Sequence, residues 1–314
     1  MKDISWTKKG CIFNVDASYD WNKSCARVPV VEILNESVWR VYYGSKNNLN
    51  RGSVSYFDVE AGKPENVIYT HDKPILLRGA LGTFDELGIM PSCILSHDSK
   101  KYFYYIGYNV KKTLPYHNGI GLAIGNNKTD TFERFSDGPL FEINYKEPFF
   151  NASSFVMKDE NKWKMWYLST TEWRMIDNRA EPLYHIKYAE SNNGIDWKRE
   201  GLVAIDYKSK AEGGIARPFV IKKNGKYSMW YSYRNLIGYK TDKKASYRIG
   251  YAESDDGIVW TRLDEHAGID VSEDSWDSGM ICYPYLVEWG NKLFMFYNGN
   301  NFGETGIGYA TAEL

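Results

Sequence analysis

Several features that mark other protein classes are missing from this sequence of 314 residues. No stretch approaches the roughly 20 consecutive apolar residues of a membrane-spanning helix, and the N-terminus, MKDISWTKKG, lacks the apolar core of a secretory signal. The five histidines show no HExxH or other metal-ligand spacing, and the net charge of −1 gives no reason to expect nucleic acid. No CxxC pair occurs among the four cysteines, which are Cys11, Cys25, Cys93 and Cys282. We therefore expect a cytoplasmic protein with reduced thiols, no metal or cofactor, and no nucleic-acid or membrane partner.

Helix-period segments of useful length are also missing, whereas one pattern of strands and turns recurs. Residues 163–197 and 227–260 both run from an aromatic strand through a polar loop and an alternating strand to a Ser-Asx-Asx-Gly turn and a Trp. A tyrosine in the aromatic strand marks five copies, at Tyr43, Tyr105, Tyr167, Tyr231 and Tyr297. A second marker opens the preceding strand, at Pro29, Pro91, Ser154, Pro218 and Pro284. Because both markers repeat every 62 to 66 residues, the chain is a repeat protein.

Each repeat offers four short strands bounded by turn residues. In the fourth repeat we expect strands at 218–221, 227–233, 247–252 and 258–260. Alternation and enrichment in β-branched and aromatic residues favour strand over helix. Four antiparallel strands repeated radially form a blade of a β-propeller, whereas solenoid repeats are usually shorter or helical. The predicted fold class is all-β, a five-bladed β-propeller forming one domain over residues 1–314.

The two ends of the chain suggest how such a ring closes. Residues 4–10, ISWTKKG, resemble residues 195–201, IDWKREG, which make a fourth strand. The fifth repeat stops after its third strand, at 308–311. We therefore expect residues 4–10 to supply the outer strand of the last blade, which protects edges that would otherwise stay open.

Acidic residues recur in the loops before the first strands, which we expect to meet around the propeller axis. They are Asp16, Asp20, Asp85, Glu86, Glu147, Glu212 and Asp277. Carboxylates this close repel one another unless they bind hydroxyls, pair with arginine or hold a proton. Aromatic faces beside carboxylates suit a sugar, and Trp21, Trp173 and Trp276 lie in or near the same loops. The candidate catalytic residues are Asp20, Asp85, Glu147, Glu212 and Asp277, with Trp173 and Trp276 as candidate substrate contacts.

A purely structural role is the alternative for acids in such turns, because an Asp there often only bonds local backbone. We expect that role for Asp16, Asp206 and Asp270, which follow fourth strands. Glu190 and Glu253 repeat at the far end of the third strand, which indicates blade architecture.

Basic residues at the expected substrate end indicate an anionic group in the ligand. In the fourth repeat these are Arg217, Arg234 and Arg248. His185 takes the place of Arg248 in the third repeat, and Arg27 with Arg51 nearly reproduces the set in the first. Arginine offers a planar, two-pronged donor suited to carboxylate or phosphate. The alternative is that these arginines only neutralise neighbouring acids.

The sequence resembles bacterial glycosidase-like five-bladed propeller proteins, which are distant relatives of the arabinanase/β-xylosidase, levanase/invertase and mannoside-phosphorylase families. The resemblance covers essentially the whole chain. It is carried by the five repeats and by the segments 84–92, 184–191, 216–218 and 276–278. The hydrolase families carry a catalytic Asp near blade one, a supporting Asp in blade two and an acid Glu in blade three or four. By position, the resemblance implies Asp16 or Asp20, then Asp85, then Glu147 or Glu212.

Two motifs of those families are absent here: an Asn-Asp-Pro-Asn segment near the N-terminus and an Arg-Asp-Pro in the third repeat. Three functions therefore stay open. The first is a glycoside hydrolase or transglycosylase with paired carboxylates acting on a sugar or glycan. The second is a phosphorylase or another enzyme of phosphorylated or acidic sugars, which needs one acid and cations for phosphate. The third is a non-catalytic carbohydrate-binding propeller.

Overall fold

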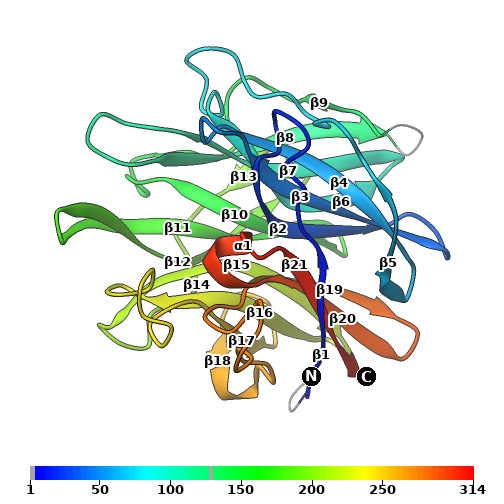
Figure 1. Ribbon diagram of the computed structural model, residues 1–314. Coiled ribbons are helices and arrows are strands. Elements are labelled where there is room, and N and C mark those ends of the chain that lie inside the picture. The colour runs from blue at the N-terminus through cyan, green and yellow to red at the C-terminus, as the bar shows by residue number, and fades with distance from the viewer. Residues whose placement is uncertain (1–3, 127–129) are drawn as a thin grey trace.

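The computed structural model describes residues 4–126 and 130–314, and almost every regular element in it is a β-strand (Figure 1). Within these residues the helical segments are η1, Asp264–His266, and α1, Asn300–Gly303. The predicted all-β class is confirmed. Neither helical segment has the length or apolar content that crossing a membrane requires.

Antiparallel pairing sorts the described strands into five groups, one for each sequence repeat. Repeat one holds β2 Ser24–Ile33, β3 Val38–Lys46, β4 Gly52–Glu60 and β5 Lys63–Thr70. Repeat two holds β6 Gly88–His97, β7 Lys100–Asn109, β8 His117–Asn126 and β9 Phe132–Arg134. Repeat three holds β10 Asn151–Asp159, β11 Lys162–Ile176, β12 Arg179–Ser191, β13 Trp197–Lys198 and β14 Val203–Ile205. Repeat four holds β15 Glu212–Lys223, β16 Lys226–Asn235, β17 Arg248–Ser254 and β18 Thr261–Arg262. Repeat five holds β19 Cys282–Trp289, β20 Lys292–Asn298, β21 Ile307–Glu313 and the N-terminal β1 Thr7–Phe13.

The first strands of the repeats contact one another in a cycle. β2 contacts β6, β6 contacts β10, β10 contacts β15, β15 contacts β19, and β19 contacts β2. Each first strand is therefore the inner strand of its group. The marker tyrosines, on the second strands, are fully buried in all five repeats.

The N-terminal strand pairs with the last strand of the chain. β1 lies antiparallel to β21, with Thr7 opposite Thr311 and Phe13 opposite Ile307. The strand begins three residues later than the predicted 4–10. The reason is Trp6, which leaves the ladder to pack against Trp230 of repeat four and donates its indole N–H to Ala267 O.

The fourth strands also begin later than expected. Trp260 lies at the end of the Ser-Asx-Asx-Gly turn, where its indole N–H donates to Gly257 O at 3.0 Å. Trp197 does the same with Gly194 O in repeat three. The indole thus closes the turn, and pairing in repeat four starts only at Thr261.

A bulge recurs near the start of each inner strand, where the register with the second strand shifts. In four repeats the residue before the Pro or Ser marker has a positive φ, namely Val28, Ser153, Arg217 and Tyr283. Non-glycine residues adopt this conformation only where surrounding structure imposes it. The bulge therefore lies at the beginning of each inner strand, next to the axis around which the five inner strands are arranged.

The four thiols are free, and they differ in burial. Cys11 is exposed, whereas Cys25, Cys93 and Cys282 are buried. Burial raises the pKa of Cys93 to about 11 and also raises the pKa of Cys282, which keeps both as unreactive thiols.

We expect a thiol reagent to modify Cys11 first in the native protein and all four cysteines after unfolding without reductant. A time course of labelling followed by peptide mass analysis checks this. The Cys11→Ser variant should lose the fast phase. Fewer than four reactive thiols in denaturant would contradict the expected reduced state.

Candidate functional site

A cavity of about 650 Å³ lies where the inner strands begin. Every repeat contributes at least one residue from the start of its inner strand, among them Arg27, Met90, Ala152, Ala216 and Tyr283. The loops between second and third strands of repeats one, two, four and five also line it. We call this space the axial cavity.

The charged lining of the axial cavity is mostly basic. It comprises Arg27, Lys46, Arg51 and Lys240 against one carboxylate, Glu304. Lys240 already pairs with Glu181 at 2.6 Å. Among the described residues, no carboxylate lies within ion-pair distance of the other three cations, and the buried Nε of Arg27 has no hydrogen-bond partner. The Arg27 guanidinium, together with burial, lowers the pKa of Lys46. A bound anion would relieve this crowding of positive charge.

Tyrosines form much of the remaining wall: Tyr108, Tyr116, Tyr184, Tyr239, Tyr247 and Tyr283. The hydroxyls of Tyr184 and Tyr247 bond each other, and Tyr239 donates to Glu181 at 2.7 Å. In the described part of the chain no protein group bonds the hydroxyls of Tyr116 and Tyr283, both partly buried in the cavity wall. Aromatic faces with free hydroxyls are suited to an amphipathic ligand such as a sugar.

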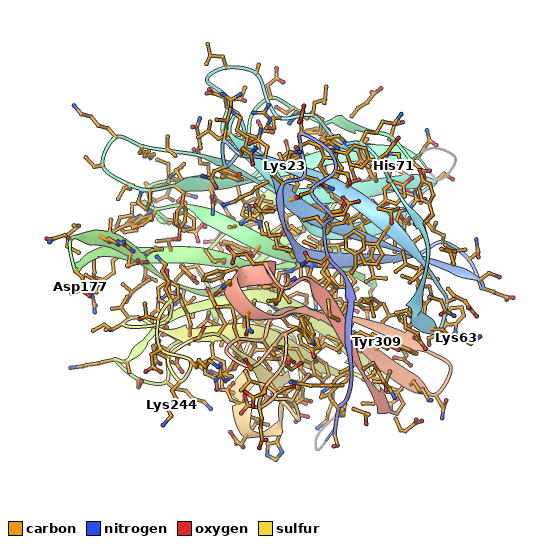
Figure 2. All side chains as sticks on the ribbon, in the orientation of Figure 1. Lys23, Lys63, His71, Asp177, Lys244 and Tyr309 are labelled. Atoms are coloured by element: carbon orange, nitrogen blue, oxygen red, sulfur yellow. The ribbon has the colours of Figure 1, made fainter. Side chains whose placement is uncertain are left out.

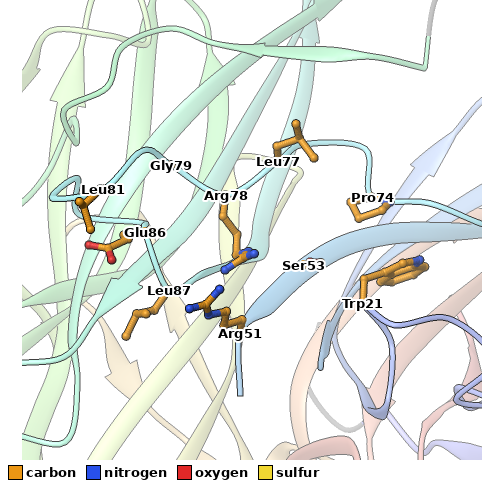
Figure 3. A pocket seen from close by; sticks show the side chains of 10 residues that line it. All are labelled: Trp21, Arg51, Ser53, Pro74, Leu77, Arg78, Gly79, Leu81, Glu86 and Leu87. Carbon is orange, nitrogen blue, oxygen red and sulfur yellow. The ribbon is translucent and has the colours of Figure 1, made fainter. Parts of the chain in front are cut away.

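A second cavity of about 500 Å³ adjoins the first and shares Arg51 and Leu87 with it. Figure 3 shows Arg51 and Arg78 pointing their guanidinium groups toward each other, with Trp21 to one side and Glu86 to the other. Glu86 accepts a hydrogen bond from the Gly82 amide at 2.9 Å. The basic surface therefore continues from the axial cavity between repeats one and two.

None of the predicted catalytic carboxylates lines the axial cavity. Asp85 is fully buried and accepts hydrogen bonds from the Tyr105 hydroxyl at 3.1 Å and from Arg134 Nη2 at 2.7 Å. Tyr105 is the marker tyrosine, and Arg134 follows the aromatic Phe132 of the fourth strand by two residues. We call this set of acid, marker tyrosine and following cation a clamp.

The clamp recurs in repeats three and five. Glu147 accepts from the Tyr167 hydroxyl at 2.9 Å and from Arg199 Nη1 at 3.0 Å. It also lies 3.0 Å from Ser169 Oγ and 3.2 Å from Lys187 Nζ. In repeat five, Asp277 accepts from Tyr297 at 3.0 Å and from Lys8 Nζ at 2.7 Å.

Repeat four has a split version of the clamp, and repeat one has none. Arg262 makes a two-pronged pair with Glu212, at 2.8 and 3.1 Å, and also pairs with Asp264. The Tyr231 hydroxyl donates to Asp264 rather than to Glu212. In repeat one the buried Asn22 occupies the acid's place near Tyr43, while the Asp20 side chain is fully exposed.

The predicted arginines of repeat four bond either to backbone carbonyls or to an acidic side chain. Arg217 is fully buried and donates to Ser92 O and to Pro29 O, the latter at 2.9 Å. Arg234 is equally buried, donates to Pro182 O and lies over the Tyr239 ring. Arg248 pairs with Asp270 at 2.9 Å. Of the predicted arginines, Arg27 and Arg51 line the axial cavity and have no acid partner among the described residues.

The remaining predicted substrate contacts are His185, Trp173 and Trp276, none of which lines the axial cavity directly. His185 Nδ1 bonds Asp206 at 3.0 Å, while its buried Nε2 has no partner. Burial lowers the pKa of His185. Trp173 packs against Tyr116 and Phe150, which line the axial cavity, whereas Trp276 packs on Tyr297 of the clamp. The described residues contain no group of three His, Cys, Asp or Glu able to hold a metal.

No family model matches the chain. It is 34% identical over 310 residues to the "Uncharacterized protein Rv1502" of Mycobacterium tuberculosis strain H37Rv, which covers 99% of this chain and 100% of that protein. The chain belongs to the Rv1502 family. The protein MT1551 of M. tuberculosis strain CDC 1551 matches equally, at 34% over 310 residues.

Solved structures share the fold of this Rv1502-family protein at low identity. One called "Glycoside hydrolase" has a TM-score of 0.73 at 16% identity, covering 100% of this chain and 93% of that one. A thermostable family-43 glycoside hydrolase has a TM-score of 0.66 at 18% identity, covering 94% and 90%. A structure from the GH130 family of mannoside phosphorylases has a TM-score of 0.69 at 13% identity, covering 99% and 93%. The resemblance to glycosidase-like propeller proteins is therefore confirmed for the fold.

The sequence alone missed several cavity residues of this family member. Lys46, Tyr108, Lys240 and Glu304 all come from the loops between second and third strands, or from their borders. These loops vary in length and sequence between repeats, so the repeat markers give them no register. The one available signal was that all these loops lie at the same end of the strands, which suggests that they border a common cavity.

Proposed function

We propose that this protein is a carbohydrate-active enzyme whose axial cavity holds a saccharide with a negatively charged group, or a neutral sugar together with phosphate. The observation that carries the proposal is the cluster of Arg27, Lys46 and Arg51, without an acid partner, beside free tyrosine hydroxyls. Arginine and lysine bind phosphate and carboxylate through charge-assisted hydrogen bonds. Tyrosine faces and hydroxyls complement the two sides of a sugar ring.

The fold that frames this cavity is, we propose, one five-bladed propeller over residues 1–314, closed by β1. The five antiparallel groups, the cyclic contacts of the inner strands and the pairing of β1 with β21 support it. In that arrangement the axial cavity is the central pocket, the usual place for a ligand in a ring of blades.

Among the possible reactions, transfer involving phosphate fits the axial cavity better than two-carboxylate hydrolysis. Hydrolysis requires a protonated carboxyl and a second carboxylate on opposite sides of one bond. The described lining of the axial cavity offers one carboxylate, Glu304, whereas its cations would hold phosphate. Glu304 is then the candidate proton donor to the departing sugar oxygen.

Hydrolysis remains a second candidate because a third cavity brings two carboxylates together. This space, of about 620 Å³, is lined by Glu172 and Glu212 with Tyr207 and Lys208. Glu212 is one of the predicted catalytic residues. A glycosidase acting there should lose turnover by about 10²–10⁴ in Glu212→Gln, and it should not require phosphate.

We expect phosphate, sulfate or a uronic acid to raise the melting temperature, and neutral glucose not to. At about 100 times Kd, linkage adds about 2.7 kcal/mol, which for a chain of this size is a shift of about 5 °C. The Arg27→Gln/Arg51→Gln double variant should lose the shift, since it removes the two-pronged donors. Lys226→Gln, an exposed lysine at the far end of β16, is the matched control.

Two outcomes would contradict this assignment of the axial cavity. One is the absence of any thermal shift with these anions up to high millimolar concentration. The other is an unchanged shift in the double variant. Phosphate-dependent cleavage of a glycoside by the wild type, measured by release of sugar phosphate, then separates phosphorolysis from hydrolysis.

A further inference from the structure

Four hairpin loops around the mouth of the axial cavity each present one exposed apolar side chain. These residues are Leu49, Val110, Met175 and Ile237, exposed to 70%, 57%, 69% and 64% respectively. They lie between the second and third strands of repeats one, two, three and four, or at the border of such a loop. Single exposed apolar residues are ordinary on protein surfaces, but here the same loop of four successive repeats carries one.

These loops lie at one face of the molecule. Leu49, Val110 and Tyr239 from three of them line the axial cavity. The third hairpin joins them through Trp173, which packs on Tyr116 of the second loop. Figure 2 shows Asp177 and Lys244, near the tips of the third and fourth hairpins, on the same side of the molecule, with Lys63 on the other. Lys63 begins β5, at the opposite end of the strands.

The same face is strongly basic, although the whole chain has a net charge of −1. Segments 46–51, 110–116 and 236–246 together contain seven Lys and Arg and a single acid, Asp242, and the third hairpin, residues 172–181, adds two arginines and three acids. Within the described residues, Lys111, Lys112, Lys243 and Lys244 have no carboxylate within ion-pair distance. Their charge is therefore available to an external anionic partner. We call the four apolar residues with these lysines the loop ring.

We propose that the loop ring docks the protein on an anionic lipid bilayer. Apolar side chains that insert at the headgroup boundary, with lysines beside them, form the usual composition of a peripheral membrane-binding surface. A second copy of this chain is a poor occupant, because it would bring the same positive charge to the contact. The sequence alone predicted no membrane partner, since apolar residues separated by about 60 positions leave no hydrophobic run to detect.

The docking does not depend on chemistry in the axial cavity. If the cavity acts on a saccharide, as proposed above, docking turns its mouth toward the lipid headgroups. Saccharides attached to membrane lipids then become the accessible substrates.

Sedimentation with phosphatidylglycerol vesicles and with phosphatidylcholine vesicles tests the proposal. We expect binding to the anionic vesicles that weakens as salt is added, because screening reduces attraction beyond about one Debye length. The Leu49→Ser/Ile237→Ser variant should lower the partition coefficient about tenfold, since it removes two anchors. Lys111→Gln/Lys112→Gln should weaken binding and flatten its salt dependence.

Val259→Ser is the matched control, because Val259 is equally exposed, at 74%, but lies in the turn at the opposite end of β17. It should bind like the wild type. Arg27→Gln should keep vesicle binding even if it loses the anion effect, which separates failure here from failure of the proposed function. No binding to either vesicle, equal binding to both, or equal loss in Val259→Ser would overturn the proposal. Association into a dimer that Leu49→Ser/Ile237→Ser abolishes would also overturn it.

Discussion

The Glu147→Gln variant is expected to lose about 3–5 kcal/mol of unfolding free energy, the cost of breaking a buried ion pair by removing one partner. Glu147 is 1% exposed, and its carboxylate faces Arg199 and Lys187. The amide keeps the size of the side chain but leaves both cations without a counter-charge. Urea unfolding followed by tryptophan fluorescence measures the loss.

Asp20→Asn is the matched control, since its side chain is fully exposed and sits 3.8 Å from Lys23. Surface pairs of this kind contribute about 0–1 kcal/mol, so the stability should hardly change. The same pair of variants separates a structural from a catalytic role for Glu147. Unchanged stability of Glu147→Gln with loss of turnover would show that the clamp is catalytic.

The second large effect is expected at Arg217 of repeat four, which contacts three other repeats at the axis. Its guanidinium donates to Pro29 O of repeat one and Ser92 O of repeat two, and it packs over the Tyr285 ring. Arg217→Ala should cost about 3–5 kcal/mol, because it leaves two carbonyls unpaired and opens a large void. Denaturant unfolding of the variant provides the measurement.

The Arg217→Met variant separates the stability lost with the hydrogen bonds from the stability lost to the void. Methionine fills most of the volume but donates no hydrogen bond, so we expect a loss of about 1–3 kcal/mol, the cost of unsatisfied buried groups. Burial lowers the pKa of Arg217 to about 10, which indicates that its charge is costly where it lies. If Arg217→Met is as stable as the wild type, the hydrogen bonds from Arg217 to the two carbonyls do not stabilise the packing of the repeats at the axis.

The repeat markers predicted the strand pattern because their environment is the same in every repeat. The five marker tyrosines are fully buried, and each second strand pairs with the strands before and after it. Strand starts were harder to predict, since the Trp260 indole bonds the preceding turn and strand pairing in repeat four begins only at the next residue, Thr261. Whether the indole bonds the turn depends on the orientation of a backbone carbonyl, and no local sequence pattern encodes that orientation.

The placement of the acids could not be predicted for a different reason. Asp85, Glu147 and Asp277 each precede a marker tyrosine by 20 residues, and each pairs with a cation two residues after an aromatic. The acid before the marker tyrosine and the cation after the aromatic both recur in the sequence with the period of the repeat. The cation, however, comes from the far side of the repeat, and for Asp277 from Lys8 at the other end of the chain. An acid's loop position gave no indication of which partner it would meet.

The pairing of β1 with β21 also determines which side of the protein faces outward when the chain is attached to a support by one of its ends. β21 runs from Ile307, beside the loops of the axial cavity, to Glu313 at the opposite end of the sheet, where Thr7 begins β1. Figure 1 shows the start of β1 and the end of β21 at the same edge of the molecule. A tether at either terminus therefore leaves the molecule on the side away from the cavity. Immobilisation by the termini should hold the mouth of the cavity outward, free for soluble saccharides and for lipid surfaces alike.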